Sequence, residues 1–302
     1  MGMLTTDDGV NLYYEDTGEG TPIVFVHEFA GDYRSWEPQV RFFARRYRCI
    51  TYSARGYTPS EVPDGIERYS QERFRDDVRC VMDALGLERA HIVGLSMGAF
   101  ATLHFGMRYC AQGTPARALS LTLAGCGSGA HPADHEQFRA NARSLAETID
   151  RQGMGHLAAT YGHGSARVQF RNKDPRGFAE SNAQLAQHSA AGSANTMRGY
   201  QASRPSLYDL TEQIAAIDVP VLVMTGDEDE PCLEPSLLLK RTISKAALAV
   251  LPKSGHAINL EEPALFNQLL ADFLHQVESG RWSPRDPAAA CASIYGPAGK
   301  PN

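Results

Sequence analysis

The sequence predicts an α/β fold in which a mostly parallel, doubly wound sheet carries a helical insertion. Short continuous apolar runs, such as residues 23–26, alternate with segments whose apolar residues recur at helical spacing, such as residues 35–45. Parallel strands are buried on both faces and need crossover connections, so this alternation indicates a sheet with helices on both sides. The alternation stops between about residues 127 and 207, where alanine-rich helical segments contain no strand run.

The residue pattern predicts individual strands and helices along the chain. Residues 10–15 alternate between apolar and polar, which predicts a half-exposed antiparallel strand and hence a mixed edge of the sheet. Residues 70–87 place Phe74, Val78 and Val81 on one helical face, as expected of a helix that packs on a sheet. Pro263 begins the last predicted helix. The remaining predicted strands are residues 23–26, 47–52, 91–93, 119–124, 219–225 and 247–251.

These patterns divide the chain into a core, an insertion and a tail. We assign residues 1–126 and 208–279 to the core and residues 127–207 to a helical cap. Residues 280–302 are rich in Pro, Ala and Gly without periodicity, which predicts a peripheral or disordered tail.

The composition argues against some classes of binding partner. A chain of 302 residues with 43% hydrophobic content can bury a large core, and its net charge of −6 has no basic excess for nucleic acid. Its six cysteines lack C-x-x-C spacing, so we expect them to be reduced and buried. No signal peptide or membrane span is recognisable, and we therefore expect a cytoplasmic protein that binds neither membrane nor nucleic acid. A homodimer is left open.

The segment Gly94-Leu95-Ser96-Met97-Gly98 matches the pattern G-x-S-x-G between a strand pattern and a helical pattern. Glycines on both sides permit a tight strand-to-helix turn that exposes the central hydroxyl. Ser96 is therefore the candidate nucleophile.

An acid and a base follow in the chain. The strand pattern at residues 219–225 leads into the acidic turn Gly226-Asp227-Glu228-Asp229-Glu230, where one carboxylate can orient an imidazole. The strand pattern at residues 247–251 leads into a loop that contains Gly255 and His256. His256 is the histidine that follows the last strand pattern with a glycine before it, which makes it the candidate base.

Nucleophile, acid and histidine in this order resemble the α/β-hydrolase family, and the likeness covers roughly residues 3–278. The resemblance implies that Asp229, three residues after Gly226, is the acid rather than Asp227. It also implies a cap over the site and an oxyanion hole formed by the backbone N–H groups of Met97 and Phe29. The loop His27-Glu28-Phe29-Ala30-Gly31 is similar to the family's His-Gly-x-x-Gly segment.

Glu28 departs from that segment, since it stands where glycine is usual. A carboxylate that faced the oxyanion hole would oppose the developing negative charge. We therefore expect Glu28 to point away and to pair with a cation such as Arg55. Alternatively, Glu28 positions a water or binds a polar substrate group, so His27 and Glu28 are also candidate substrate-binding residues.

A serine nucleophile excludes the relatives of this fold that use aspartate, namely haloalkane dehalogenases and epoxide hydrolases. The remaining chemistry is acyl transfer, and we expect hydrolysis of an ester or lactone of a small substrate through an acyl-enzyme. The alternatives are hydrolytic C–C cleavage of a β-diketone-like compound and a ligand-binding protein with little turnover. The cap carries nine Lys/Arg against six Asp/Glu, which favours a carboxylate-bearing substrate, although solvated surface arginines explain the same count. We find no motif for a metal or cofactor.

Overall fold

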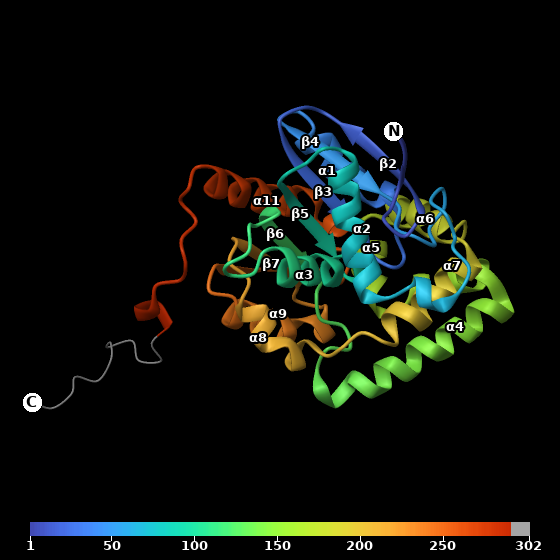
Figure 1. Cartoon of the computed structure of the whole chain (residues 1–302). Coiled ribbons are helices and arrows are strands. Elements are labelled where there is room, and N and C mark those ends of the chain that lie inside the picture. Colours follow the sequence, from blue (N-terminus) through green and yellow to red (C-terminus); the bar gives the residue numbers. More distant parts are fainter. Residues whose placement is uncertain (291–302) are drawn as a thin grey trace, which may run out of the picture.

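An eight-stranded sheet in the order β1-β2-β4-β3-β5-β6-β7-β8 forms the centre of the computed structural model, which describes residues 1–290 (Figure 1). β1 pairs with β2, and β2 with β4, in antiparallel register, whereas all later pairs are parallel. The predicted mixed edge is thus confirmed. The strands are β1 (Gly2–Thr5), β2 (Asn11–Thr17), β3 (Thr21–Val26), β4 (Tyr47–Tyr52), β5 (Ala90–Leu95), β6 (Ala118–Ala124), β7 (Val221–Gly226) and β8 (Ala246–Leu251).

Helices cover both faces of this sheet, as the alternating pattern predicts. One buried cluster joins the sheet to Phe43 of α1 and Phe266 of α11, and a second joins it to Phe74 of α2 and Phe100 of α3. The core helices are α1 (Glu37–Phe43), α2 (Gln71–Ala84), α3 (Met97–Tyr109), α8 (Thr211–Ala215), α9 (Glu230–Thr242), α10 (Ile258–Glu261) and α11 (Pro263–Glu278).

Local sequence explains where these helices begin. The Ser70 hydroxyl accepts a hydrogen bond from the N–H of Arg73 and so caps α2. The side chain of Asp174 caps α6 (Pro175–Leu185) in the same way, with Pro175 in the first turn where no N–H is needed.

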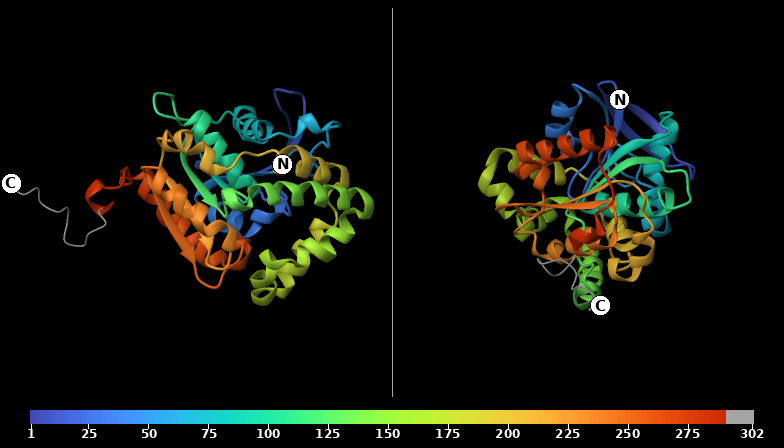
Figure 2. Two further views of the ribbon diagram at one scale, coloured as in Figure 1. Left: turned by 90° about the horizontal axis from the view of Figure 1, so that it is seen from below. Right: turned by 90° about the vertical axis from the view of Figure 1, so that its left-hand side faces the viewer.

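The insertion between β6 and β7 is helical and gathers on one side of the sheet (Figures 1 and 2). Its long first helix is interrupted at Gly153, whose φ of 74° lies in the left-handed region. The insertion helices are α4 (Pro132–Thr160), α5 (Val168–Lys173), α6 (Pro175–Leu185) and α7 (Ala190–Asn195), with a π-helical segment at Thr196–Gln201.

The beginning of the predicted tail is held to the core. Trp282 Nε1 donates to the Lys245 carbonyl at 2.8 Å, and its ring packs on Phe273 at 4.6 Å between centroids. Residues 291–302 of that tail, including Cys291, lie outside the described residues. Within residues 1–290 the five cysteines are unpaired and buried. No helix in this part of the chain combines the length and the apolar character required to cross a membrane.

Candidate active site

Ser96 occupies a strained turn between β5 and α3. Its φ of 52° and ψ of −114° are rare for a residue other than glycine. The turn is possible because a Cβ on Gly98 would lie 2.1 Å from the Val26 carbonyl oxygen, and one on Gly94 would lie 2.4 Å from Thr102 Oγ1. Gly98 therefore lets the start of α3 touch the end of β3, and Gly94 lets β5 approach α3 closely. The Ser96 side chain stays half-buried.

Asp229 and His256 lie together beyond the ends of β7 and β8. The imidazole Nδ1 donates to Asp229 Oδ2 at 2.7 Å, and both residues are only 5% exposed. Burial raises the pKa of Asp229, but His256, Cys232 and Arg167 together lower it to below its usual value, so the carboxylate stays ionised. Burial lowers the pKa of His256, whereas Asp229 and Cys232 together raise it to well above its usual value. The pair is therefore arranged to stabilise an imidazolium.

Asp227, the other aspartate of the turn, lies apart from the His256 ring. Its side chain is exposed and accepts a hydrogen bond from the N–H of Ser254 at 3.0 Å. The backbone N–H groups of Lys253 and Ser254 lower its pKa. Asp227 thus supports the loop backbone and makes no contact with the His256 ring.

The serine and the Asp229–His256 pair meet at one short segment, the end of β6. Ser96 donates its N–H to the Ala124 carbonyl at 2.8 Å. A Cβ on the next residue, Gly125, would lie 3.3 Å from the His256 ring and 3.5 Å from Asp229 Oδ2. No hydrogen bond joins the Ser96 hydroxyl to His256 in this structure, and such contacts often form only when a substrate is bound.

Two backbone N–H groups of the predicted oxyanion hole have no acceptor among residues 1–290. Those of Phe29 and Met97 donate to no other residue in the described part of the chain. A Cβ on Gly98 would also lie 2.7 Å from the His27 carbonyl oxygen, so the loop that carries Phe29 lies against the start of α3. Unpaired donors that converge on a nucleophile can stabilise an oxyanion.

Glu28 pairs with a cation, but the predicted partner is wrong. The carboxylate forms a buried ion pair with Arg167 of the insertion, 139 residues away. Arg55 instead binds Asp77 at 2.6 Å and Asp8 at 2.9 Å. Arg167 lies next to Ala166, whose carbonyl accepts from the N–H of His256. One cap segment therefore contacts both the loop that carries His256 and the loop of residues 27–31, called the oxyanion loop after its predicted role.

Breaking this pair is expected to destabilise the fold. Arg167→Met leaves the Glu28 carboxylate buried without its cation, and we expect a loss of about 3–5 kcal/mol in the free energy of unfolding. The double variant Glu28→Gln/Arg167→Met should recover part of that loss, because no lone buried charge remains. Urea unfolding measures both, with Arg176→Met, an exposed cap arginine, as the control that should change by less than about 0.5 kcal/mol. Equal losses for Arg167→Met and Arg176→Met would contradict the importance of the pair.

The same pair predicts a pH dependence. Burial raises the pKa of Glu28, but Arg167, together with His256 and His27, lowers it, so the folded-state pKa lies below the ordinary value. Such a group stabilises the fold above its unfolded pKa of about 4.3, and this contribution is lost as pH falls through the folded-state pKa. Wild type should therefore exceed Glu28→Gln in stability at neutral pH, and the gap should close below about pH 4. A gap in urea midpoint that is unchanged between neutral and acidic pH would refute this linkage.

His27 is part of the scaffold in this structure. Its Nδ1 donates to the Glu28 carbonyl at 2.7 Å, and its Nε2 accepts from the N–H of Ala54 at 2.9 Å. Burial lowers the pKa of His27 to about 4, so the ring is neutral. Neither ring nitrogen is left for a substrate in this arrangement.

Two residues that sequence reasoning missed complete the surroundings of His256. The buried Glu261 carboxylate accepts from the N–H groups of Gly255 at 2.6 Å and Ala257 at 3.0 Å, which clamps the loop on both sides of the histidine. Cys232, in the first turn of α9, brings its Sγ close to Asp229 and His256. Burial raises the pKa of this thiol to about 11, so it is protonated at neutral pH and is no competing nucleophile.

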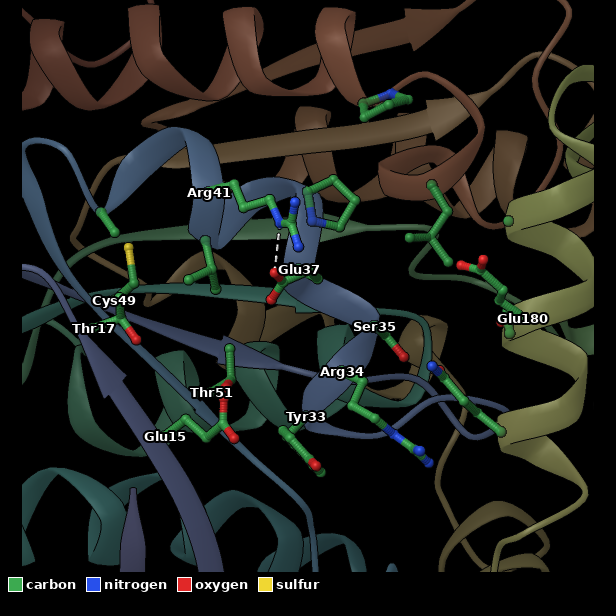
Figure 3. Close-up of a pocket in the computed structure, with 18 of the residues that line it drawn as sticks. Glu15, Thr17, Tyr33, Arg34, Ser35, Glu37, Arg41, Cys49, Thr51 and Glu180 are labelled. Carbon is green, nitrogen blue, oxygen red and sulfur yellow. Dashed lines mark hydrogen bonds and ion pairs between the residues drawn. The ribbon is translucent and has the colours of Figure 1, made fainter.

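A surface cavity of about 660 Å³ lies away from this chemistry. Figure 3 shows its lining, which comes from strands β2 and β4, the α1 region and α6 of the insertion. None of Ser96, Asp229 and His256 lines it, and its Glu37 and Arg41 pair with each other at 2.6 Å. A second cavity of about 10 Å³, roughly the space of one water, lies where Arg167 meets the oxyanion loop at Ala30. The insertion is thus closed over the oxyanion loop.

The chain is similar to known proteins along most of its length. The model of the alpha/beta hydrolase fold family matches residues 21–263. The chain is 29% identical to a 3-oxoadipate enol-lactonase of Acinetobacter baylyi over 279 residues, which cover 91% of this chain and 97% of that protein. It is 28% identical to a non-heme haloperoxidase of Rhodococcus erythropolis, with 92% and 100% covered. A solved esterase from Thermogutta terrifontis has a TM-score of 0.79 and 27% identity, with 91% and 98% covered.

Proposed function

Because the chain belongs to the alpha/beta hydrolase fold family and is a hydrolase, we propose that it cleaves a small ester or lactone through an acyl-enzyme on Ser96. The observation that carries the proposal is the meeting of the strained Ser96 turn with the Asp229–His256 pair at the end of β6. A relative named as an enol-lactonase and a structural neighbour named as an esterase support this chemistry. Reduced, buried cysteines support a cytoplasmic location.

Each side chain has a role in this reaction. Since Nδ1 of His256 donates to Asp229, the opposite nitrogen, Nε2, is free to accept the Ser96 proton as the hydroxyl attacks the carbonyl. The N–H groups of Phe29 and Met97 bind the oxyanion. His256 then returns the proton to the leaving alcohol, and in a second step it activates the water that releases the acid.

The favoured substrate carries a carboxylate. Arg204 is 3% exposed, and its guanidinium stacks on Phe100 at 3.8 Å and on Phe138 at 4.4 Å. Its hydrogen bonds go to neutral oxygens of Ser128 and Gln201, and it forms no ion pair within residues 1–290. The hydroxyl of the same Ser128 lies 3.5 Å from Cys232 Sγ, which is close to Asp229. The Arg204 guanidinium, which has no ion-pair partner within residues 1–290, is therefore near the Asp229–His256 pair. A buried positive charge there favours an anionic ligand.

A pair of esters tests both the reaction and the charge preference. The p-nitrophenyl esters of succinate and of 4-methylpentanoate have acyl groups of similar shape, but only the first carries a terminal carboxylate. We expect turnover of both after subtraction of the rate of Ser96→Ala, with kcat/KM higher for the hemisuccinate by about tenfold, worth 1.4 kcal/mol. Arg204→Met should reduce that ratio. If the two esters have similar kcat/KM values in the wild type, the proposed preference for a carboxylate is wrong. No burst or turnover with any ester or lactone would instead point to a binding protein.

A further inference from the structure

Cys232 is a buried thiol that the proposed reaction does not use. Its N–H donates to the Asp229 carbonyl at 2.8 Å, so the first turn of α9 ties the two residues together. Its Sγ lies 3.5 Å from the Gly125 carbonyl oxygen and 3.5 Å from the Ser128 hydroxyl. No part of the side chain is exposed. The thiol is therefore fixed against the acid and the histidine.

The three side chains make a compact set of metal-binding atoms. A carboxylate oxygen of Asp229, Sγ of Cys232 and a ring nitrogen of His256 all lie within 4.8 Å of one another. Zn²⁺ binds these three donor types at about 2.0–2.3 Å, and three protein ligands with one open position are common at zinc sites. Small side-chain rotations would place all three donors on one ion.

We propose that Asp229, Cys232 and His256 form an inhibitory site for a thiophilic divalent cation, Zn²⁺ or Cd²⁺. As the ion binds, the Cys232 S–H bond is replaced by a sulfur–metal bond and the proton passes to solvent. On His256 the metal takes Nδ1, the nitrogen that faces Asp229, and the Nδ1 proton moves through solvent to Nε2. Nε2 then carries a proton and can no longer accept one from Ser96. Bound metal therefore stops the hydrolysis proposed for Ser96. The inhibition depends on that proposed function, whereas the binding does not.

Charge and donor chemistry decide which cations fit. The guanidinium groups of Arg167 and Arg204 lie nearby and disfavour an uncompensated cation. One carboxylate and one thiolate balance a divalent ion, so the loaded site is neutral. Mg²⁺ prefers oxygen ligands and keeps its waters, and a site with one thiolate and one imidazole should reject it.

Cadmium absorbance tests the binding without turnover. Cd²⁺ is titrated into the full chain carrying Ser96→Ala, and the ultraviolet charge-transfer band of the cadmium–thiolate bond is recorded. We expect a band that saturates at one Cd²⁺ per chain, that Zn²⁺ removes and that Mg²⁺ leaves in place. Adding Cys232→Ser should abolish the band, whereas adding Cys110→Ser, a control at another buried thiol, should retain it.

Inhibition of the hydrolase provides the second measurement. The Zn²⁺ concentration for half-inhibition should be at least about tenfold higher for Cys232→Ser than for Cys110→Ser, a difference of 1.4 kcal/mol in binding. Cys232→Ala replaces Cys232→Ser if circular dichroism shows that the serine variant is unfolded. The proposed metal site is wrong if the cadmium–thiolate band persists in the variant without Cys232, or if no such band appears in the chain that keeps Cys232. Absence of ester turnover would refute the proposed function, while the band would still decide the metal site.

Discussion

Replacing Ser96 with alanine is expected to lower turnover of a p-nitrophenyl ester on the order of a million-fold, the loss seen when a serine protease loses its nucleophile. Alanine keeps the Cβ and removes the only atom that can attack. The turn that holds Ser96 at a φ of 52° is set by the contacts of Gly94 and Gly98, which the substitution leaves in place. The melting temperature should therefore stay within a few degrees of wild type.

Covalent labelling separates this mechanism from others. Wild type should react with a fluorophosphonate at one site, and Ser96→Ala should not react. Ser128→Ala is the matched control, because that hydroxyl also lies near the acid side of the site at 3.5 Å from Cys232 Sγ, and it should be labelled like wild type. If Ser96→Ala is labelled at the wild-type rate, another residue is the nucleophile.

Asp229→Asn is expected to lower kcat by about ten-thousand-fold, as loss of the orienting carboxylate does in a serine protease triad. The carboxylate accepts the Nδ1 proton of His256 at 2.7 Å, which directs the other ring nitrogen toward the serine. An amide in its place can donate instead of accept, and it then stabilises the wrong tautomer. Fluorophosphonate labelling should slow in parallel, because the serine is activated by the same histidine.

Asp227→Asn is the paired control for this loss. Its carboxylate is exposed and its hydrogen bond goes to the N–H of Ser254, so we expect less than about a tenfold change, equivalent to 1.4 kcal/mol of barrier. The same kinetic assay measures both variants. Equal losses, or a larger loss for Asp227→Asn, would assign the acid role to Asp227.

Features that depend on neighbouring residues could be predicted from the sequence. The turn around Ser96 needs glycine at two positions where backbone and side chains approach closely, so residue type alone indicates it. The strands and helices likewise follow from apolar spacing, and Ser70 and Pro263 mark helix starts. The fold class therefore needed no coordinates.

Features that depend on residues distant in the chain could not be predicted in this way. Acidic composition does not separate Asp229 from Asp227, and the structure does so by the direction in which each side chain leaves the turn after β7. The partner of Glu28 is Arg167 because the closed insertion buries that guanidinium against the oxyanion loop. The nine cationic residues of the cap are equivalent in the sequence. Folding removes Arg167 from water beside the Glu28 carboxylate, and the free-energy cost of leaving a buried charge unpaired then favours contact between these two residues.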